Sequence, residues 1–496
     1  MIRIVVPADA QPGDTLLLTR GQAEGHWSCK VQPMTHDVAA PPAVAPEDDL
    51  ARHQRLWSAI MDAGGAWSSK LARGTSPALT VPGVVATEPI AAGEELGSVP
   101  SSLFLSAEAV RKKAPELCRA VDALPPQEHT GLPAQVTIMV QLLVAAEERR
   151  AAGRAASGCL TVWEAFADVL ACETLADHPY RLALRDPKSF RSLLDPSPEA
   201  ELVERVAWGV LARYEVIVQK VEPAMLGHGF TAERFLRAWL LLVTRAFETG
   251  GARTTLVPGM DSFNHRPQRA GVQVYWDADA GTMRVKATRD IARGEEVFIS
   301  YGDLCNPMLY RTYGFTLPPA EEPGWTCVLM PAAAQHILKA HLPPAHAAKI
   351  IEFDSRRLHP TVVGALKAAQ SKGRETGDEG EASRALLEEL LRFRIAAYLQ
   401  DVLLKPTRES LERVGDGGES HWASWDVILA GADAARLSAG GAAVTDALRV
   451  KASGYLCLAA HLEALDDPVA AGGLPRAAAE GLRNSLRGVF LGGLAV

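Results

Sequence analysis

Three short segments in the middle of the chain hold the side chains best suited to chemistry. The first is DSFNH at 261–265, which combines a carboxylate, an amide and an imidazole. The second is ARGEEVFISYG at 292–302, and the third is Asn306 followed seven residues later by Tyr313-Gly314-Phe315. Taken singly, these segments are typical of a turn with a buried histidine, a hairpin, and a half-buried tyrosine that ends a strand. Their occurrence together, in this order, indicates one composite site.

The first 49 residues predict a small β unit followed by a connection. Apolar and β-branched runs at 2–6 and 15–19 flank a Pro-Gly-Asp turn at 12–14. An accessory binding module and a purely structural β ornament both fit this pattern. Residues 37–49 contain PPAVAPEDD and are predicted to be a linker.

The next segment changes from helix to short strands. A short helix is predicted at 50–66, with an apolar side formed by Leu56, Ile60 and Met61. Residues 81–106 then predict a sheet with tight turns, because Gly and Pro separate short β runs at 84–85, 96–99 and 103–105.

Residues 107–248 have a mostly helical period, and the clearest helix follows Thr231. Thr231 is a good N-cap, and Phe230 and Phe235 fit a hydrophobic staple. The predicted apolar face consists of Ala232, Phe235, Trp239, Leu242 and Ala246, with Glu233, Arg234 and Arg237 facing away.

Strands and turns return at 254–316, and residues 331–496 are helical in pattern, with a polar loop at 371–383. Two β blocks split by a helical segment suggest one β domain with an insertion. The periodicity therefore predicts an α+β chain and, by itself, no function.

Composition narrows the function classes. The chain has 496 residues and a net charge of −8, which gives no cationic field for nucleic acid. Its seven cysteines are odd in number and form no CxxC, so we expect neither a disulfide framework nor a zinc site. No apolar run of membrane-spanning length occurs. We expect an intracellular monomer that is not secreted, in the cytoplasm or nucleus rather than the chloroplast, because the first residues carry no leader pattern.

The motifs resemble those of SET-domain methyltransferases, in particular the subgroup of the Rubisco lysine methyltransferases and the actin-histidine methyltransferases. DSFNH resembles the D-x-x-N-H motif, and residues 294–315 resemble G-E-x-(apolar)-x-I-x-Y-G…N…(Y/S)-G-F. Residues 84–106 resemble the N-terminal SET half, and TRAF at 244–247 resembles the S/T-R-x-x segment. The chain departs from the pattern at Val81, Pro82 and Val85, where the first glycine of G-x-G and a basic residue found in some relatives are missing.

The resemblance implies a domain plan and a fold. The SET domain would be an α+β fold of small sheets with a pseudoknot, in which the Asn264-His265 segment passes under Tyr301-Gly302. The implied divisions are a β unit at 1–36, a linker at 37–49, a SET domain at 50–317, and an all-α substrate-binding-like domain at 318–496. Within the SET domain the halves would lie at about 75–106 and 236–317, around a helical insertion at 107–235.

The resemblance also implies roles for individual residues, with S-adenosylmethionine as cofactor and no metal. Tyr301 would be catalytic and would orient the transferred methyl and the target nitrogen. Arg245 would pair with the cofactor carboxylate. The remaining implied cofactor-binding residues are Asp261, Asn264, His265, Tyr313, Gly314 and Phe315, and the implied substrate channel is formed by Phe247, Met260 and Tyr313.

The implied partner is a folded non-histone protein methylated on lysine. Histidine-directed relatives carry Asn and Trp where this chain has Phe247 and Met260, so lysine is favoured over histidine. A catalytically weak binding module is the remaining alternative, and the departures at Val81 and Pro82 motivate it.

Overall fold

A computed structural model gives the fold of the chain, which divides into two compact units, Met1–Ala43 and Val44–Val496. In the first unit the structure describes two strands, and in the second it describes most of residues 46–317 together with a few positions beyond. The gaps within 46–317 are 75–81, 125–132, 153–159, 174, 195–196 and 250–251. Val81 and the polar loop at 371–383 therefore lie outside the described residues.

The first unit contains an antiparallel strand pair. Strand β1 (Thr15–Arg20) pairs with β2 (Trp27–Gln32), with Leu17 opposite Lys30. The predicted strand at 15–19 is thus present, but its described partner is β2, which the sequence pattern does not identify. The predicted run at 2–6 lies outside the described residues.

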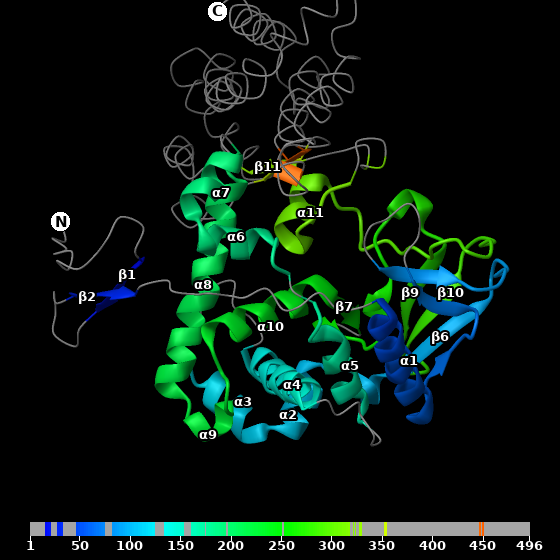
Figure 1. Ribbon diagram of the computed structural model, residues 1–496, viewed down its shortest axis with the longest axis horizontal. Coiled ribbons are helices and arrows are strands. Elements are labelled where there is room, and N and C mark those ends of the chain that lie inside the picture. The colour runs from blue at the N-terminus through cyan, green and yellow to red at the C-terminus, as the bar shows by residue number, and fades with distance from the viewer. Residues whose placement is uncertain are drawn as a thin grey trace, which may run out of the picture. The chain divides into compact units, whose positions relative to one another are not determined.

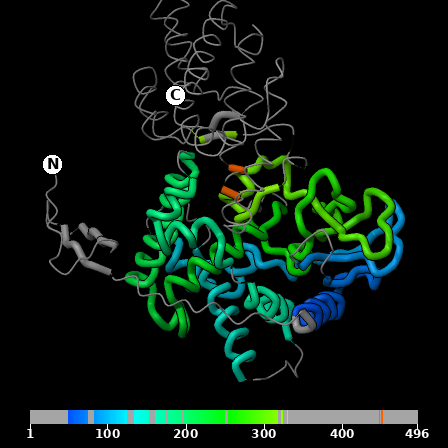
Figure 2. The backbone as a smooth tube through the Cα atoms, turned by 45° about the horizontal axis from the view of Figure 1, so that its top comes forward, coloured from blue at the N-terminus to red at the C-terminus, as the bar shows by residue number. Residues whose placement is uncertain are grey.

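A four-stranded sheet joins the two β blocks that the insertion separates in the sequence. Its order is β3-β6-β10-β9, with neighbouring strands antiparallel. Strands β3 (Ala66–Trp67) and β6 (Glu95–Pro100) come from the first block, whereas β9 (Val272–Asp277) and β10 (Thr282–Ala287) come from the second. Figure 2 shows these blue and green segments side by side. The two blocks therefore form one domain, as the sequence predicts.

Two smaller pairs complete the β structure near the site. Strand β4 (Leu71–Gly74) pairs with β5 (Gly83–Ala86), and β7 (Ala246–Thr249) pairs with β8 (Ala252–Leu256). Isolated bridges from β5 and from Ile90 to residues 296 and 291 also connect the first block to the second. The predicted strand at 103–105 is wrong, because Ser101–Leu103 is a turn of 3₁₀ helix and only Leu105 bridges to β8.

The insertion is helical, as predicted, and lies beside the sheets (Figure 1). Its described helices are α2 (Ala107–Lys113), α3 (Pro115–Asp122), α4 (Pro133–Ala151), α5 (Val162–Leu170), α6 (Pro179–Arg185), α7 (Pro187–Leu194), α8 (Glu199–Lys220) and α9 (Pro223–Leu226). Helix α4 packs on α5 and on α10 (Ala232–Arg245), and α8 packs on α6 and α10. One continuous hydrophobic core runs from the insertion into the sheets.

Helix α10 leads from the insertion directly into the second β block. Its N-terminus has the predicted cap, since the Thr231 hydroxyl accepts from the Arg234 amide, and the Phe230 and Phe235 rings lie 5.7 Å apart. Burying a phenylalanine such as Phe235 contributes about 1.5–3 kcal/mol. The prediction that Arg237 faces away is wrong: its guanidinium donates to the carbonyls of Leu170 and Ala171, which end α5.

Helix α1 (Pro46–Asp62) begins earlier than predicted, inside the expected linker. Leu56 and Ile60 are fully buried, but Met61 is exposed, because it lies five residues from Leu56 and leaves the apolar face. The helix packs on α5 and on the strands β3 and β4.

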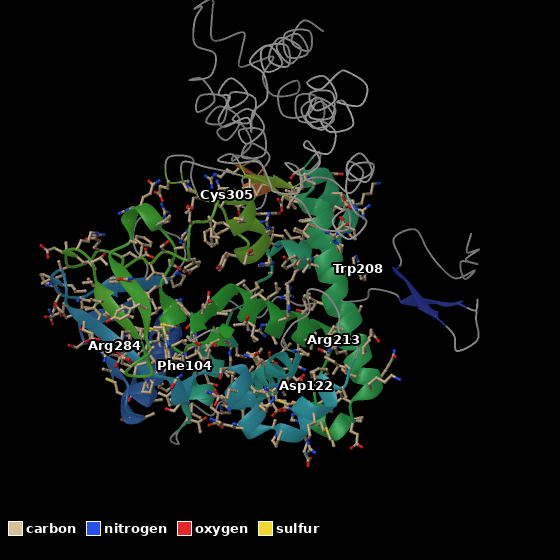
Figure 3. The ribbon with its side chains drawn as sticks, turned by 180° about the vertical axis from the view of Figure 1, so that it is seen from behind. Phe104, Asp122, Trp208, Arg213, Arg284 and Cys305 are labelled. Atoms are coloured by element: carbon tan, nitrogen blue, oxygen red, sulfur yellow. The ribbon has the colours of Figure 1, made fainter. Side chains whose placement is uncertain are left out.

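Helix α11 (Asn306–Tyr313) replaces the strand-and-turn structure expected near 306–313. Pro307 in its first turn and Gly314 just after it are ordinary start and stop signals for a helix. Cys305 precedes the helix (Figure 3), and its sulfur lies 2.8 Å from that of Cys327.

The predicted all-helical region after residue 318 lies largely outside the described residues. Among its described residues, β11 (Cys327–Leu329) and β12 (Glu352–Asp354) form a short antiparallel pair, which is a local exception to the helical pattern. In the part of the chain that the structure describes, no helix has the length and apolarity needed to cross a membrane.

Candidate functional site

The site is built where two segments of the second β block run alongside each other. His265 forms a parallel bridge with Ile299, and Ala270 forms another with Phe298. The Ile299 amide donates to the Asn264 carbonyl at 3.0 Å, and the Arg266 amide donates to the Ile299 carbonyl at 3.1 Å. The DSFNH and ISYG motifs, distant in sequence, are thereby brought together in the way that the predicted pseudoknot requires.

Tyr301 is held on both its backbone and its side chain. Its hydroxyl donates to the Phe263 carbonyl at 2.8 Å, and its amide donates to Nδ1 of His265 at 2.9 Å. The two rings stack with centroids 4.9 Å apart. Burial raises the pKa of the Tyr301 hydroxyl well above its usual range, so the phenol stays protonated at neutral pH and can act as a hydrogen-bond donor.

His265 is a neutral imidazole with a fixed tautomer. Burial lowers its pKa to about 4, and Nδ1 must be unprotonated to accept the Tyr301 amide. The proton therefore sits on Nε2, which is buried and has no hydrogen-bond partner among the described residues. This N–H is therefore a buried donor that no described residue satisfies.

Aromatic rings from α11 and the residues after it extend the Tyr301 surface. Tyr313 lies 5.0 Å from Tyr301 and 6.1 Å from Phe315, measured between ring centroids, and Phe315 lies 6.2 Å from His265. Gly314 has φ +80°, and its amide donates to the Leu309 and Tyr310 carbonyls, which ends α11. The left-handed glycine turn therefore sets where Tyr313 and Phe315 project.

Arg245, the last residue of α10, is held by two carboxylates. Its guanidinium lies 3.0 Å from Oδ2 of Asp261 and 2.8 Å from Oε1 of Glu173. Burial disfavours its charged form, but Glu173 and Asp261 outweigh that effect and raise its pKa above the usual range. Nε of Arg245 is buried and has no hydrogen-bond partner among the described residues, so the guanidinium keeps a donor beyond these two ion pairs, and its pairing with a cofactor carboxylate stays a prediction.

Asn264 connects the N-terminal SET half to the second β block. Its amide donates to Oε1 of Glu296 at 2.8 Å and to the Pro82 carbonyl at 3.2 Å. A Cβ on Gly83 would lie 2.3 Å from Oε1 of Glu296, so a larger residue there would force the Glu296 carboxylate or the Asn264 amide to move. The other carboxylate oxygen of Glu296, Oε2, is buried without a partner among the described residues. Both N–H groups of the Asn264 side chain are therefore used inside the protein, and its predicted role in cofactor binding stays a prediction.

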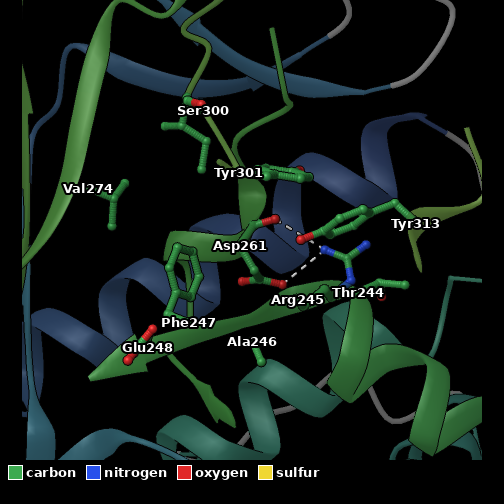
Figure 4. Close-up of a pocket in the computed structure, with 11 residues that line it drawn as sticks. Thr244, Arg245, Ala246, Phe247, Glu248, Asp261, Val274, Ser300, Tyr301 and Tyr313 are labelled. Atoms are coloured by element: carbon green, nitrogen blue, oxygen red, sulfur yellow. Dashed lines mark hydrogen bonds and ion pairs between the residues drawn. The ribbon is translucent and has the colours of Figure 1, made fainter. Parts of the chain in front are cut away.

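A cavity of about 170 Å³ opens beside these residues. It is lined by Thr244, Arg245, Ala246, Phe247, Glu248, Asp261, Val274, Ile299, Ser300, Tyr301 and Tyr313. Figure 4 shows Tyr301 and Tyr313 on one side of it and β7, with Phe247, on the other. Of the predicted channel residues, Phe247 and Tyr313 line this cavity. Met260 does not, because it is fully buried in the hydrophobic core.

The sequence reasoning missed three carboxylates. Glu296 lies within a segment that carried the resemblance and Glu248 directly follows another, so their types could have drawn attention. Glu173 could not be found in that way, because it reaches Arg245 across 72 residues of chain and no local pattern marks it.

Comparisons with known proteins agree with this geometry. Residues 82–302 match the SET domain family model, and this part of the chain is a SET domain. The ribosomal lysine N-methyltransferase set11 of Schizosaccharomyces pombe is 37% identical over 89 residues, which are 17% of this chain and 23% of that protein. Ribosomal lysine N-methyltransferase 4 of the same yeast is 41% identical over 61 residues, 12% of this chain and 13% of that protein. The matches thus span less than a quarter of either curated relative.

Solved structures show the same fold over a longer stretch. The SET domain of LSMT bound to lysine and AdoHcy aligns with a TM-score of 0.55 and 16% identity, covering 82% of this chain and 89% of that one. Rubisco LSMT bound to AdoMet aligns with a TM-score of 0.55 and 15% identity, covering 82% and 90%. The predicted fold class, a SET domain split by a helical insertion, is confirmed.

Proposed function

We propose that this protein is a protein-lysine N-methyltransferase that uses S-adenosylmethionine. The observation that carries the proposal is the cavity bounded by the Tyr301 and Tyr313 rings, next to a buried set of polar groups inside a SET domain. Its relatives in yeast are described as ribosomal lysine N-methyltransferases, and structures of the same fold are described as bound to AdoMet or to lysine and AdoHcy.

The residues fit S-adenosylmethionine in shape and polarity. The Phe315 and Tyr313 rings, which are only partly buried, offer faces on which an adenine ring could stack. The Nε2–H of His265 and Oε2 of Glu296 are buried groups that lack partners among the described residues, and a ligand with both acceptors and donors would satisfy them. When bound, the cofactor supplies an electrophilic methyl group on a sulfonium.

Tyr301 would be the residue nearest the reacting atoms. Because its hydroxyl donates to the Phe263 carbonyl, its oxygen lone pairs stay available to contact the transferred methyl and the target amine. Methyl transfer by direct displacement needs a neutral nitrogen held in line, and good orientation supplies roughly 7–11 kcal/mol of the barrier. The apolar walls formed by Phe247, Val274 and Tyr313 would lower the pKa of an entering lysine, so that it can lose its proton to water.

The finer proposal is that the substrate is a folded protein other than a histone. It rests on the helical segment after residue 318, which is similar in type and length to the substrate-binding domain of the Rubisco subgroup, and on the ribosomal targets named for the yeast relatives. Histidine remains the alternative target, and Phe247 is the lining residue that favours lysine over it.

The test is methylation of a proteome extract with labelled S-adenosylmethionine, followed by mass spectrometry of the labelled proteins. The full-length protein is compared with Tyr301→Phe, which keeps the ring stacking but loses the hydroxyl. We expect a labelled lysine with the wild type and a loss of at least about 100-fold in rate with the variant, the scale seen when one oriented group of an active site is removed.

A second variant separates catalysis from folding. Tyr310→Phe removes a hydroxyl from a buried ring on α11 that does not line the cavity, so it serves as the matched control and should keep the activity. Label on histidine would overturn the lysine proposal. No label with the wild type, together with no S-adenosylmethionine binding by calorimetry, would support the binding-module alternative.

A further inference from the structure

Glu248 is an exposed carboxylate that lines the cavity and has no assigned role. It lies on β7, three residues after Arg245, which corresponds to roughly 10 Å of extended chain. In the view of Figure 4 the Phe247 ring lies between the Glu248 carboxylate and the Tyr301 ring. Glu248 therefore belongs to the outer part of the cavity, away from the reacting atoms.

Glu248 lies at an irregularity in the β7–β8 pair, where one residue of β7 faces two residues of β8. Phe247 pairs with Thr255 and Thr249 pairs with Ala252, but the register shifts between Phe247 and Thr249, which leaves Glu248 without a partner in the ladder. Successive side chains of a regular strand point to opposite faces. Here Phe247 and Glu248 both line the cavity, beside the irregular part of the pair.

The charge at Glu248 is not balanced by the other charged residues that line the cavity. The other charged lining residues, Arg245 and Asp261, form an ion pair with each other, and Glu173 adds a second carboxylate on Arg245. Among the side chains that the structure describes, Glu248 has no ion-pair partner. The neighbouring walls, including Phe247, Val274 and Ile299, are apolar, and low-dielectric walls strengthen the attraction of a lone carboxylate for a cation.

The target lysine is not the cation that Glu248 would hold. The target nitrogen must lose its proton before it can accept a methyl group, and a carboxylate beside it would instead stabilise the protonated form. A lysine that reaches Tyr301 through its four-carbon stem places its own backbone at the outer part of the cavity. The side chains of the residues next to it in the substrate would then pass close to Glu248.

We propose that Glu248 determines substrate specificity by holding a lysine or arginine side chain adjacent to the target lysine in the substrate. This inference rests on the proposed function, but its test measures peptide binding and does not require turnover. The outer part of the cavity would then prefer substrate segments that are rich in basic residues.

The experiment uses three fluorescent peptides with one central lysine: Gly-Arg-Lys-Arg-Gly, Gly-Gln-Lys-Gln-Gly and Gly-Glu-Lys-Glu-Gly. Their dissociation constants are measured by anisotropy on the full-length protein saturated with S-adenosylhomocysteine. We expect the arginine peptide to bind about five-fold more tightly than the glutamine peptide at low salt, with the difference shrinking as salt rises. In Glu248→Gln this ratio should fall to near one, and Glu248→Lys should prefer the glutamate peptide.

Glu116→Gln is the matched control, because Glu116 is a well-exposed carboxylate on α3 that does not line the cavity, and it should keep the wild-type ratio. Equal binding of the three peptides by the wild type, no binding of the arginine peptide up to millimolar concentration, or an unchanged ratio in Glu248→Gln would each overturn the inference. Labelled methyl transfer to extract proteins, measured in parallel, separates the two proposals. Methyl transfer without a charge preference refutes the role of Glu248 alone, whereas a charge preference without methyl transfer refutes the catalytic proposal alone.

Discussion

Replacing Arg245 by methionine should destabilise the protein far more than removing an arginine from the sheet surface. Methionine keeps much of the unbranched side chain but leaves the Asp261 carboxylate, only 3% exposed, without its positive partner. Removing one partner of a buried ion pair costs about 3–5 kcal/mol, because the remaining charge is buried and uncompensated. Arg245 is itself 19% exposed, so we expect the lower end of that range, about 3 kcal/mol at pH 7.

The pH dependence gives the same prediction an internal check. Burial raises the pKa of Asp261 even with Arg245 present, and the loss of Arg245 should raise it further. The folded variant would then bind a proton more tightly than the unfolded chain, so its stability relative to the wild type rises as pH falls. The deficit should therefore shrink as pH approaches the ordinary aspartate value of about 3.9.

The assay is equilibrium unfolding in guanidinium chloride, followed by tryptophan fluorescence, with the free energy of unfolding taken from midpoint and slope. Arg284→Met is the matched control, because Arg284 also contacts two carboxylates, Glu95 and Asp277, but these are 48% and 28% exposed (Figure 3). Its loss should cost less than about 1 kcal/mol. Equal effects of the two substitutions, or a deficit in Arg245→Met that grows on acidification, would refute this account of the buried pair.

Two further predictions concern the contact between the two SET halves and the buried histidines. Gly83→Ala should destabilise the fold by about 1–3 kcal/mol and weaken S-adenosylmethionine binding in calorimetry, because the new Cβ would lie 2.3 Å from Glu296 Oε1. The control is Gly209→Ala on α8, which has open space around it and should be neutral or stabilising. A cost at Gly209 as large as that at Gly83 would count against the steric reasoning. Burial lowers the pKa of both His178 and His265 to about 4, so unfolded chains bind more protons between pH 6.5 and 4, and stability should fall as pH drops through that window. Each histidine should lower the free energy of unfolding by roughly 2 kcal/mol between pH 8 and pH 5, measured by urea unfolding. His178→Gln should remove the contribution of His178 and leave that of His265. A free energy of unfolding that does not change over this pH range would contradict the burial argument.

Local sequence determined the elements whose signals are short-range. The cap and staple of α10 depend on Phe230, Thr231 and Phe235, which lie within six residues, and all three behave as predicted. The same rules place a helix at α11 once Pro307 and Gly314 are recognised as its boundaries. The order of β block, helical insertion and β block could also be inferred, because hydrophobic period changes with secondary structure.

Only the tertiary structure decided which charges meet and what lines the cavity. Glu173 reaches Arg245 from the insertion, and Asn264 reaches Pro82 from the other SET half, contacts that no local pattern encodes. Met260 and Phe247 are both apolar neighbours of site residues in the sequence, yet one is in the core and the other faces the cavity. The reason is physical: the residue types and spacing establish that a SET site exists, whereas the partners of a buried charge and the direction of a side chain depend on how distant segments pack and on where a strand bulges.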